Sequence, residues 1–316
     1  MPTIATLTFN PALDLSTTTE RVVPTHKLRC SAPRHDPGGG GINVARVVKN
    51  LGGEATAIYT AGGPIGEILH DCLNALGLTQ RVVPIAGMTR ENMTVDEAAT
   101  GKQYRFVLPG PRLSEDEERR CLEAVAALDP APSYLVVSGG YPPGSDEDRL
   151  SAGIAAIAHR SGARLVLDTS QAMLHAPEHG VFMMKPNLNE LARMVGRKLD
   201  DRSAQVEAAR SVVERGRTEV LVVSLGHEGA LLVTRTQAEH FPTPDVPIRS
   251  AVGAGDSMVG AIVFALERGW SLTDAVRLGV AAGAATLMTP GTELCRREDV
   301  ERLFREMSAG AKTAHC

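Results

Sequence analysis

The sequence predicts an α/β fold: a mostly parallel sheet covered on both faces by helices, with a few strands standing off it. Short β-branched runs alternate with helical stretches along most of the 316 residues, which is typical of parallel strands joined by crossover helices. Five runs are predicted to be buried strands: 4–8, 55–60, 134–138, 164–168 and 219–224. Six segments have helical spacing: 42–51, 66–76, 115–128, 146–161, 187–195 and 204–215.

The carboxyl ends of these strands are polar or rich in glycine. They lead into Asn10 and Pro11, Ser138 to Gly140, Asp168 and Thr169, and Ser224 to Gly226. In an open parallel sheet, ligands collect at this edge. We therefore expect the binding site to lie there.

Two stretches, 14–33 and 82–108, interrupt the strand–helix alternation. Polar and apolar residues alternate in them without a crossover helix, as in Tyr104 to Val107, which predicts a few antiparallel strands forming a small β lid. No Ser/Pro-rich linker separates them from the rest, so residues 1–308 are predicted to form a single domain. The small and polar residues 309–316 predict a flexible tail.

Composition excludes several classes of protein. Acidic residues outnumber basic ones by 37 to 33 and no Lys/Arg block occurs, which argues against general nucleic-acid binding. No apolar run reaches membrane-spanning length and the N-terminus does not resemble a signal peptide, so we expect a cytoplasmic protein without a membrane partner. The five cysteines are far apart and form no CxxC pair, which favours reduced thiols over disulfides or zinc ligands.

The most informative segment is a glycine-rich turn before an apolar helical run. It consists of Val252, Gly253, Ala254, Gly255 and Asp256. Glycines let backbone N–H groups face a ligand at a helix start, where negative charge is stabilised, and a carboxylate there can accept a proton from an attacking hydroxyl. The segment predicts phosphoryl transfer to an alcohol, although an ordinary glycine turn would have the same pattern.

Four glycines, Gly38 to Gly41, precede a second patterned helix. A backbone without side chains lets a ligand lie against it, and Asn43 can offer its amide to a hydroxyl. We favour a binding loop over a merely flexible one. The segment is neither a Walker A loop nor a Rossmann fingerprint.

Several other polar residues are candidates for a phosphosugar and nucleotide site. The lid stretches contain Asp14, Lys27, Arg90 and Arg105, which suit hydroxyl and phosphate groups but could also be solvated surface charges. Asn187 and Glu190 could hold hydrated Mg²⁺ or form a helix capping box, and both interpretations remain open. The glycines at 226 and 229 suit close approach of a base or phosphate, and the small residues 280–285 suit either an adenine floor or helix packing.

Taken in order, these segments resemble the PfkB branch of the ribokinase-like sugar kinases over nearly the whole chain. Residues 38–45 are similar to the N-terminal signature of that family, and residues 250–257 to its C-terminal signature. The segment 10–14 and the two lid arginines resemble its phosphosugar subgroup. Within this subgroup, residues 27–30, 89–92 and 103–107 are most similar to the bacterial 6-phosphofructokinases of the PfkB type. The resemblance implies a three-layer α/β/α fold.

The resemblance also implies a reaction and its residues. Asp256 would be the general base toward the C1 hydroxyl of fructose 6-phosphate, with the amides of Gly253, Ala254 and Gly255 on the transferred phosphoryl group. The phosphosugar would be held by Asp14, Lys27, Gly39, Gly40, Asn43, Arg90 and Arg105. The ATP site would comprise Lys185, Asn187, Ser224, Gly226, Gly229, Val252, Val280 and Ala284. Glu190 would organise Mg²⁺ through water, and the lids would pair into a homodimer.

Three departures from the family pattern stand out. Ser250 and Ala251 replace the usual Asp-Thr, which leaves a K⁺ site at Ser250 open; Gly140 replaces a serine, and Glu293 an arginine. Tagatose-6-phosphate kinase and 1-phosphofructokinase are alternative activities, because each acts on a phosphorylated ketohexose. A catalytically silent sugar-phosphate sensor is an alternative of a different class, which the intact Asp256 argues against.

Overall fold

The computed structural model describes residues 4–176 and 179–313. The main sheet has nine strands in the order β13-β12-β11-β10-β9-β8-β1-β4-β5. They are β1 (Ile4–Thr8), β4 (Ala55–Ala61), β5 (Thr79–Pro84), β8 (Tyr134–Ser138), β9 (Arg164–Asp168), β10 (Val181–Met184), β11 (Val220–Ser224), β12 (Ala230–Val233) and β13 (Ala238–Phe241). All neighbours from β5 to β11 pair in parallel, and only β12 and β13 are antiparallel. The predicted α/β fold is confirmed.

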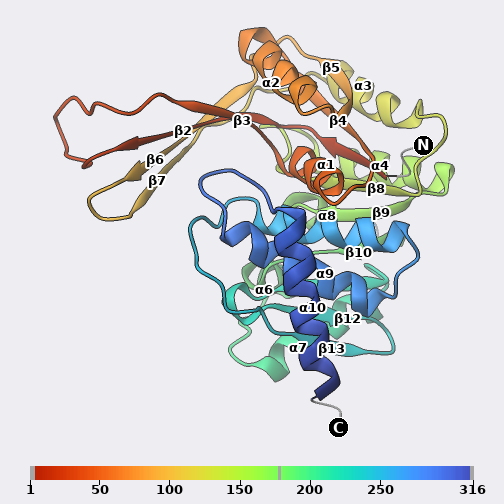
Figure 1. The fold of residues 1–316 in the computed structure, drawn as a ribbon. Helices are drawn as coiled ribbons and strands as arrows, with labels where there is room; N and C mark the ends of the chain where they lie inside the picture. The colour runs from red at the N-terminus through yellow and green to blue at the C-terminus, as the bar shows by residue number, and fades with distance from the viewer. Residues whose placement is uncertain (1–3, 177–178, 314–316) are drawn as a thin grey trace.

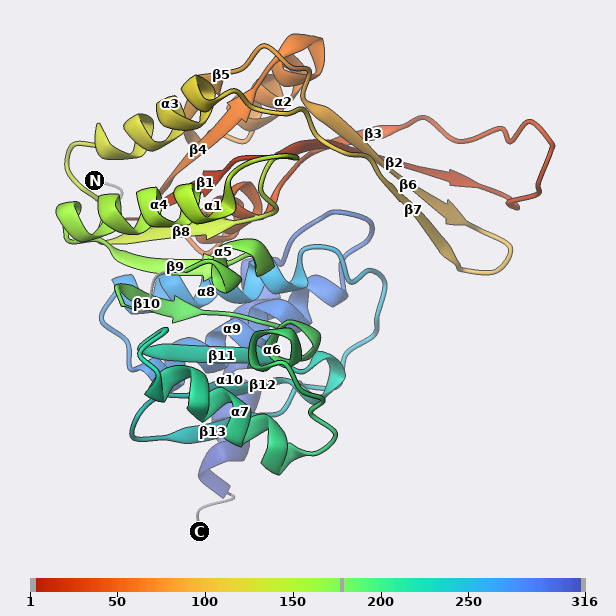
Figure 2. The same cartoon turned by 180° about the vertical axis from the view of Figure 1, so that it is seen from behind.

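Helices cover both faces of this sheet and produce three layers. One face carries α1 (Gly40–Asn50), α2 (Gly63–Ala75), α8 (Ala254–Glu267), α9 (Leu272–Leu287) and α10 (Arg297–Thr313), seen toward the viewer in Figure 1. The other face, which Figure 2 brings forward, carries α3 (Glu115–Ala126), α4 (Glu147–Ser161), α5 (Ser170–Leu174), α6 (Leu188–Val195) and α7 (Arg202–Glu214). Each layer buries its own apolar core against the sheet.

A second sheet of four strands extends from the body as the lid (Figure 1). Its order is β3-β2-β6-β7, with β2 (Ala12–Thr19), β3 (Arg34–Gly38), β6 (Arg90–Glu97) and β7 (Gln103–Val107). The lid is therefore present, but its predicted limits were wrong at two points. Strand β5 belongs to the main sheet through its pairing with β4, and the lid continues to Gly38. The expectation of purely antiparallel strands was also wrong, because β2 and β6 pair in parallel.

Helix starts follow ordinary capping chemistry. Ser114 caps α3 and forms a capping box with Glu117, while Asp146 caps α4 through the amide of Arg149. All six predicted helices are present within a few residues of their predicted limits. The predicted tail begins too early: α10 continues to Thr313, so residues 309–313 are helical, and 314–316 lie outside the described residues.

Candidate active site

The glycine-rich turn forms the start of α8. Gly253 is the N-cap residue with φ of 77°, a left-handed conformation that favours glycine, and Asp256 lies in the first turn. The first amides of a helix have no acceptor inside it, so those of Ala254, Gly255 and Asp256 are available to an anion. The structure thus places helix-start amides, which could receive an anion, and a carboxylate within one helical turn.

Asp256 is hydrogen-bonded to a residue far away in the sequence. Asn43 lies in the first turns of α1, directly after the four glycines, and its Nδ2 donates to Asp256 Oδ2 at 2.8 Å. Burial raises the pKa of Asp256 to about 6, repulsion from Asp168 adds to this, and the Asn43 hydrogen bond and Lys185 oppose it. A carboxylate with this pKa is ionised at neutral pH yet basic enough to accept a proton.

The glycines of the first signature are required by close contacts. A Cβ on Gly40 would lie 2.7 Å from the backbone nitrogen of Gly139 and would collide with Ser138 Oγ. A Cβ on Gly38 would collide with the carboxylate of Asp14. Gly39 has φ of 122°, which few other residues adopt. These contacts bring the lid strand β2, the end of β8 and the start of α1 together at one point.

Asp14 and the two lid arginines also lie near this point. Asn92 Nδ2 donates to Asp14 Oδ1 at 2.8 Å. Burial raises the pKa of Asp14, while the Asn92 hydrogen bond and the charges of Arg90 and Arg105 oppose the rise. Arg105 is exposed on β7.

Arg90 is more constrained than the sequence suggests. Its guanidinium donates to the carbonyl oxygens of Asn10 (3.1 Å), Leu108 (3.1 Å) and Pro11 (3.4 Å). These bonds tie β6 to the segment between β1 and β2. An arginine has five N–H donors, so donors remain for a phosphate.

Lys27 is not brought to this site within one chain. It is exposed in the connection between β2 and β3, beyond the bridge between Thr19 and Cys30. Thr19 is five positions after Asp14 along the strand, a distance of ~17 Å at the usual rise per residue. Within one chain Lys27 therefore lies away from Asp14, and its predicted contact with the phosphosugar stays a prediction. Sequence order could not reveal this, because it does not show how far the lid extends.

Lys185 lies on the other side of the α8 N-terminus. Its Nζ is 3.0 Å from Asp168 Oδ1, and an added Cβ on Gly255 would lie 3.3 Å from the same nitrogen. Burial alone would lower the pKa of Lys185, but the Asp168 carboxylate raises it, so the ammonium stays charged. Asp168 is a site residue that the sequence reasoning did not assign, although its place at a strand end was the available signal.

Asn187 and Glu190 form the capping box of α6. Asn187 Oδ1 accepts from the amide of Glu190 at 2.9 Å, and Glu190 Oε2 accepts from the amide of Asn187 at 2.8 Å. The capping interpretation is thus confirmed, and Glu190 Oε1 remains for another ligand. A bridge places Asn187 beside Ser224, where β11 ends.

The remaining nucleotide-site candidates differ in what surrounds them. Gly226 has open space at its Cβ position, but a Cβ on Gly229 would collide with the carbonyl oxygen of Phe241, so the latter glycine serves packing within the chain. Val280 and Ala284 are each 2% exposed inside the core, which favours the packing interpretation of α9. Val252 keeps part of its surface exposed next to Gly253.

Ser250 is buried beside this turn and contacts the loop before α10. Its Oγ donates to the carbonyl oxygen of Gly291 at 2.6 Å. The next residue, Thr292, donates to Asp36 Oδ2 of the lid strand β3 at 2.6 Å. The loop at Gly291 therefore connects the start of α8 with the base of the lid.

Other predictions concern the chain as a whole. No helix among residues 4–176 and 179–313 is long and apolar enough to cross a membrane. Within the same residues Cys30, Cys72, Cys121 and Cys295 are free thiols, as expected, and Cys316 lies outside them.

The chain is similar to known kinases over nearly its whole length. The family model for pfkB family carbohydrate kinases matches residues 8–299. The ATP-dependent 6-phosphofructokinase isozyme 2 of Mycobacterium tuberculosis is 50% identical over 96% of this chain and 89% of that protein. The isozyme 2 of Escherichia coli is 42% identical over 98% and 100% of the two chains, and a 1-phosphofructokinase of Xanthomonas campestris is 34% identical over 95% and 93%.

The same relationship holds for the fold. A crystal structure of phosphofructokinase-2 from Escherichia coli in complex with substrates and products matches with a TM-score of 0.90 at 41% identity, covering 96% of this chain and 99% of that one. The structure described above is thus a ribokinase-like α/β fold with a lid. Together with the two signatures at α1 and α8, these matches show that the chain belongs to the pfkB family of carbohydrate kinases.

Proposed function

We propose that the protein is an ATP-dependent 6-phosphofructokinase, which transfers the γ-phosphoryl group of ATP to the C1 hydroxyl of fructose 6-phosphate. The observation that supports this most directly is Asp256 in the first turn of α8, hydrogen-bonded to Asn43 and next to free helix-start amides. The relatives named 6-phosphofructokinase are more similar to this chain than the 1-phosphofructokinase relative, which supports the choice of substrate.

In this reaction Asp256 would remove the proton of the C1 hydroxyl as that oxygen attacks the γ-phosphorus. The bond from phosphorus to the leaving oxygen of ADP breaks, and the amides of Gly253, Ala254 and Gly255 stabilise the charge on the transferred group. Lys185 adds a fixed positive charge beside the same amides. The protein contributes mainly position and electrostatics.

The residues for the two substrates follow from their places in the fold. Asp14, Gly39, Gly40 and Asn43 would hold the sugar hydroxyls, and Arg90 and Arg105 its phosphate. ATP would lie along the ends of β10 and β11, near Asn187, Ser224 and Gly226. The site also depends on Gly229, Val280 and Ala284. These residues are packed inside the protein, so they would support the walls of the ATP site without contacting ATP directly.

We propose one candidate site for Mg²⁺ and one for K⁺, each because its oxygen atoms suit that ion. Mg²⁺ binds oxygen and keeps several waters, and Glu190 offers one free carboxylate oxygen to such an ion beside the ATP phosphates. Ser250 Oγ and the Gly291 carbonyl lie together beside the α8 start, an oxygen pair suited to a monovalent cation. A crystal structure of the Escherichia coli relative contains potassium.

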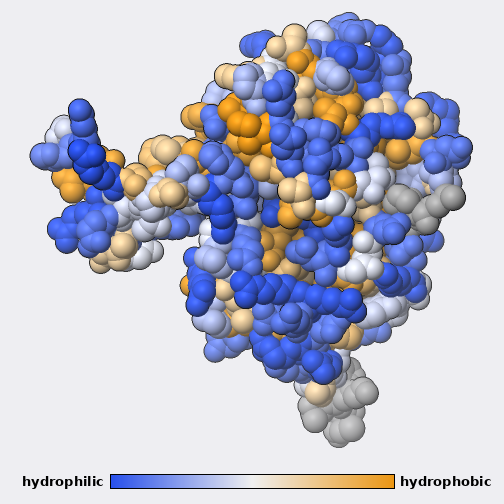
Figure 3. Space-filling view, turned by 45° about the horizontal axis from the view of Figure 1, so that its top comes forward, coloured by the Kyte–Doolittle hydropathy of each residue, from blue (hydrophilic) through white to orange (hydrophobic). Residues whose placement is uncertain are grey.

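We also propose a homodimer formed through the lid. Apolar side chains are exposed along the lid, and Figure 3 shows them on the arm that projects from the body. They are Val23, Leu28, Met93, Phe106 and Val107, each between 38% and 63% exposed. Burying such a surface against a second copy is favourable. In such a dimer, Lys27 of one copy would contribute to phosphosugar binding in the site of the other copy.

A coupled assay tests the substrate. Turnover is measured with MgATP and, in turn, fructose 6-phosphate, fructose 1-phosphate and tagatose 6-phosphate. We expect the highest kcat/KM with fructose 6-phosphate. A clear preference for fructose 1-phosphate or tagatose 6-phosphate would replace the proposed activity with 1-phosphofructokinase or tagatose-6-phosphate kinase.

The variant Asp256→Asn tests the mechanism and excludes the sensor alternative. It keeps the shape of the side chain but cannot accept the proton. We expect kcat to fall by at least ~10²-fold while ATP and fructose 6-phosphate still bind, because general-base catalysis typically contributes this much. Turnover equal to that of the natural protein would reject the assigned base.

A further inference from the structure

We infer that Arg46 is a positioning residue, which orients the Asn43 amide so that its NH₂ group faces the carboxylate of Asp256. This inference deepens the proposed function and depends on Asp256 being the base. Arg46 is one helical turn after Asn43 on α1, and its Nη1 donates to Asn43 Oδ1 at 3.1 Å. Nothing in the reaction described above uses this residue.

The hydrogen-bond chemistry permits a single orientation of the amide. A guanidinium has only donors, so the side of Asn43 that faces Arg46 must be its oxygen. The NH₂ group then faces Asp256 and donates to Oδ2 at 2.8 Å. Without Arg46 the amide could rotate and direct its oxygen at the carboxylate, where the two oxygens would repel each other. Arg46 therefore keeps the Asn43 hydrogen bond that opposes the rise in the pKa of Asp256.

Arg46 is itself held in place from a second side. The same Nη1 donates to the carbonyl oxygen of Pro37 at 2.8 Å, where β3 of the lid leads into the glycine segment. Burial lowers the pKa of Arg46, and the carboxylates of Asp36, Asp14 and Asp256 counteract this. The guanidinium thus connects the base of the lid with the catalytic carboxylate through one intervening amide.

Three other charged groups face Asp256 and influence its pKa, so they must be considered when a pH profile is interpreted. The carboxylates of Asp168, at the end of β9, and Asp14, on β2, raise its pKa, and Lys185, after β10, lowers it. None of these three is hydrogen-bonded to Arg46 in the described part of the chain. A change in the Asp256 pKa on removal of Arg46 is therefore expected to act mainly through Asn43, together with the loss of the Arg46 charge.

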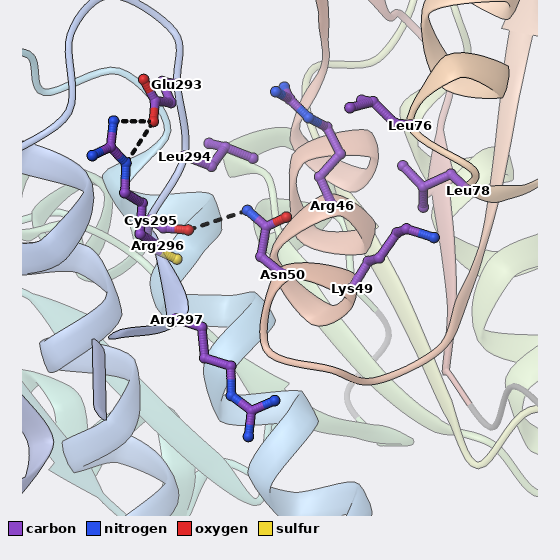
Figure 4. A pocket seen from close by; sticks show the side chains of 10 residues that line it. All are labelled: Arg46, Lys49, Asn50, Leu76, Leu78, Glu293, Leu294, Cys295, Arg296 and Arg297. Carbon is purple, nitrogen blue, oxygen red and sulfur yellow. Dashed lines mark hydrogen bonds and ion pairs between the residues drawn. The ribbon is translucent and has the colours of Figure 1, made fainter. Parts of the chain in front are cut away.

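A cavity beside Arg46 makes a chemical rescue possible. It has a volume of about 370 Å³ and is lined by residues of α1, of the turn after α2 and of the segment before α10. Figure 4 shows Arg46 and Lys49 projecting in different directions from the same helix, with Arg296 and its partner Glu293 on the opposite side of the cavity. Removing the Arg46 side chain would extend this cavity toward Asn43, so that free guanidinium can enter from it.

The test compares Arg46→Ala with Lys49→Ala across pH. Lys49 lines the same cavity, but it donates to the carbonyl oxygen of Gly77, and among the described residues no hydrogen bond joins it to Asn43. For Arg46→Ala we expect the acidic limb of the kcat profile to shift upward by about one pH unit, the size of losing one hydrogen bond to a charged group. At alkaline pH, where Asp256 is ionised in either protein, kcat should approach that of the natural protein. Lys49→Ala should leave the profile unchanged.

Rescue separates positioning from a general structural effect. Millimolar guanidinium should restore kcat of Arg46→Ala near pH 6 and return the acidic limb of its pH profile to the natural position. Urea at the same concentration should not do so, because it is uncharged. Circular dichroism and thermal melting verify that the variant is folded. An Arg46→Ala protein that is folded, with an unshifted limb and no response to guanidinium, would overturn the inference.

The reference variant Asp256→Asn distinguishes this failure from failure of the proposed function. If Asp256→Asn is inactive and Arg46→Ala keeps the natural pH limb, only the role of Arg46 is rejected. If Asp256→Asn retains turnover, the base itself is rejected, and the inference about Arg46 is rejected with it.

Discussion

Lys185 Nζ lies 3.0 Å from Asp168 Oδ1, and this ion pair is buried directly beside the first turn of α8. Ser138 Oγ donates to the other carboxylate oxygen of Asp168 at 3.1 Å. Both partners also act on Asp256, Asp168 by raising its pKa and Lys185 by lowering it. The pair therefore fixes a balance of charge around the carboxylate that we propose as the base.

Replacing Asp168 by Asn should lower the pKa of Asp256. The substitution removes the repulsion that raises this pKa and frees Lys185 to interact with Asp256. The acidic limb of kcat, which we expect near pH 6 in the natural protein, should move to lower pH, opposite to the shift predicted for Arg46→Ala. The same variant takes the nearest carboxylate away from the buried Lys185 ammonium, and Asp256 replaces it only in part, so we expect a stability loss of up to about 3 kcal/mol in urea unfolding. An unchanged limb would contradict this account of the charge balance.

Replacing Asp256 by Asn should stabilise the folded protein at neutral pH. The pKa of Asp256 is about 6 when folded, against an ordinary value of 3.8, so the folded state binds more protons than the unfolded state between these values. The natural protein therefore loses stability as pH rises through this window, and the variant lacks that loss. Melting temperatures should be higher for Asp256→Asn at pH 7 and converge with those of the natural protein below about pH 4. A lower melting temperature for the variant at pH 7 would mean that burial does not raise this pKa.

The sequence pattern was sufficient to predict six helices and several of the buried strands. The strands β1, β8 and β9 have five residues each, most of them apolar or β-branched, and their predicted limits match the structure. The short strands β10, β12 and β13 were not predicted. They have four residues each, too few for a period to be recognised, and they become strands only by pairing in the folded sheet: β10 pairs with β9 and β11, β12 with β11, and β13 with β12.

The candidate site was predictable where one local motif carries the chemistry. Asp256 and the glycines before it share one turn, so their association was evident from the sequence. The contacts of Asn43 with Asp256, and of Asp168 with Lys185, join segments that no sequence period relates. Lys27 shares a predicted lid segment with Asp14, yet an extended strand separates the two within one chain, and the sequence pattern did not indicate this separation.

Replacing Gly40 by Ala should impair both folding and sugar binding. The added Cβ would lie 2.7 Å from the backbone nitrogen of Gly139 and would collide with Ser138 Oγ, so α1 must shift away from the end of β8. Because Asn43 lies on the same turn, its hydrogen bond to Asp256 should weaken and KM for fructose 6-phosphate should rise. Overpacking of this kind typically costs about 1–3 kcal/mol. The matched control is Gly310→Ala in α10, where an added Cβ meets nothing within 4 Å. Comparable losses in both variants would show that close packing at Gly40 is not the cause.

Replacing Phe106 by Asp should dissociate the proposed dimer. Phe106 lies on β7 of the lid and is 48% exposed, so a charge there would cost little in a monomer but would be desolvated between two lids. We expect light scattering coupled to size exclusion to give the mass of a dimer for the natural protein and of a monomer for the variant, with similar melting temperatures. Ile68→Asp is the control, because Ile68 is 41% exposed on α2 of the main body rather than on a lid strand, and it should leave the dimer intact. A dimer that persists in Phe106→Asp at micromolar concentration would place the interface elsewhere. Loss of the dimer should also weaken fructose 6-phosphate binding, because we propose that Lys27 reaches the phosphosugar site from a second copy.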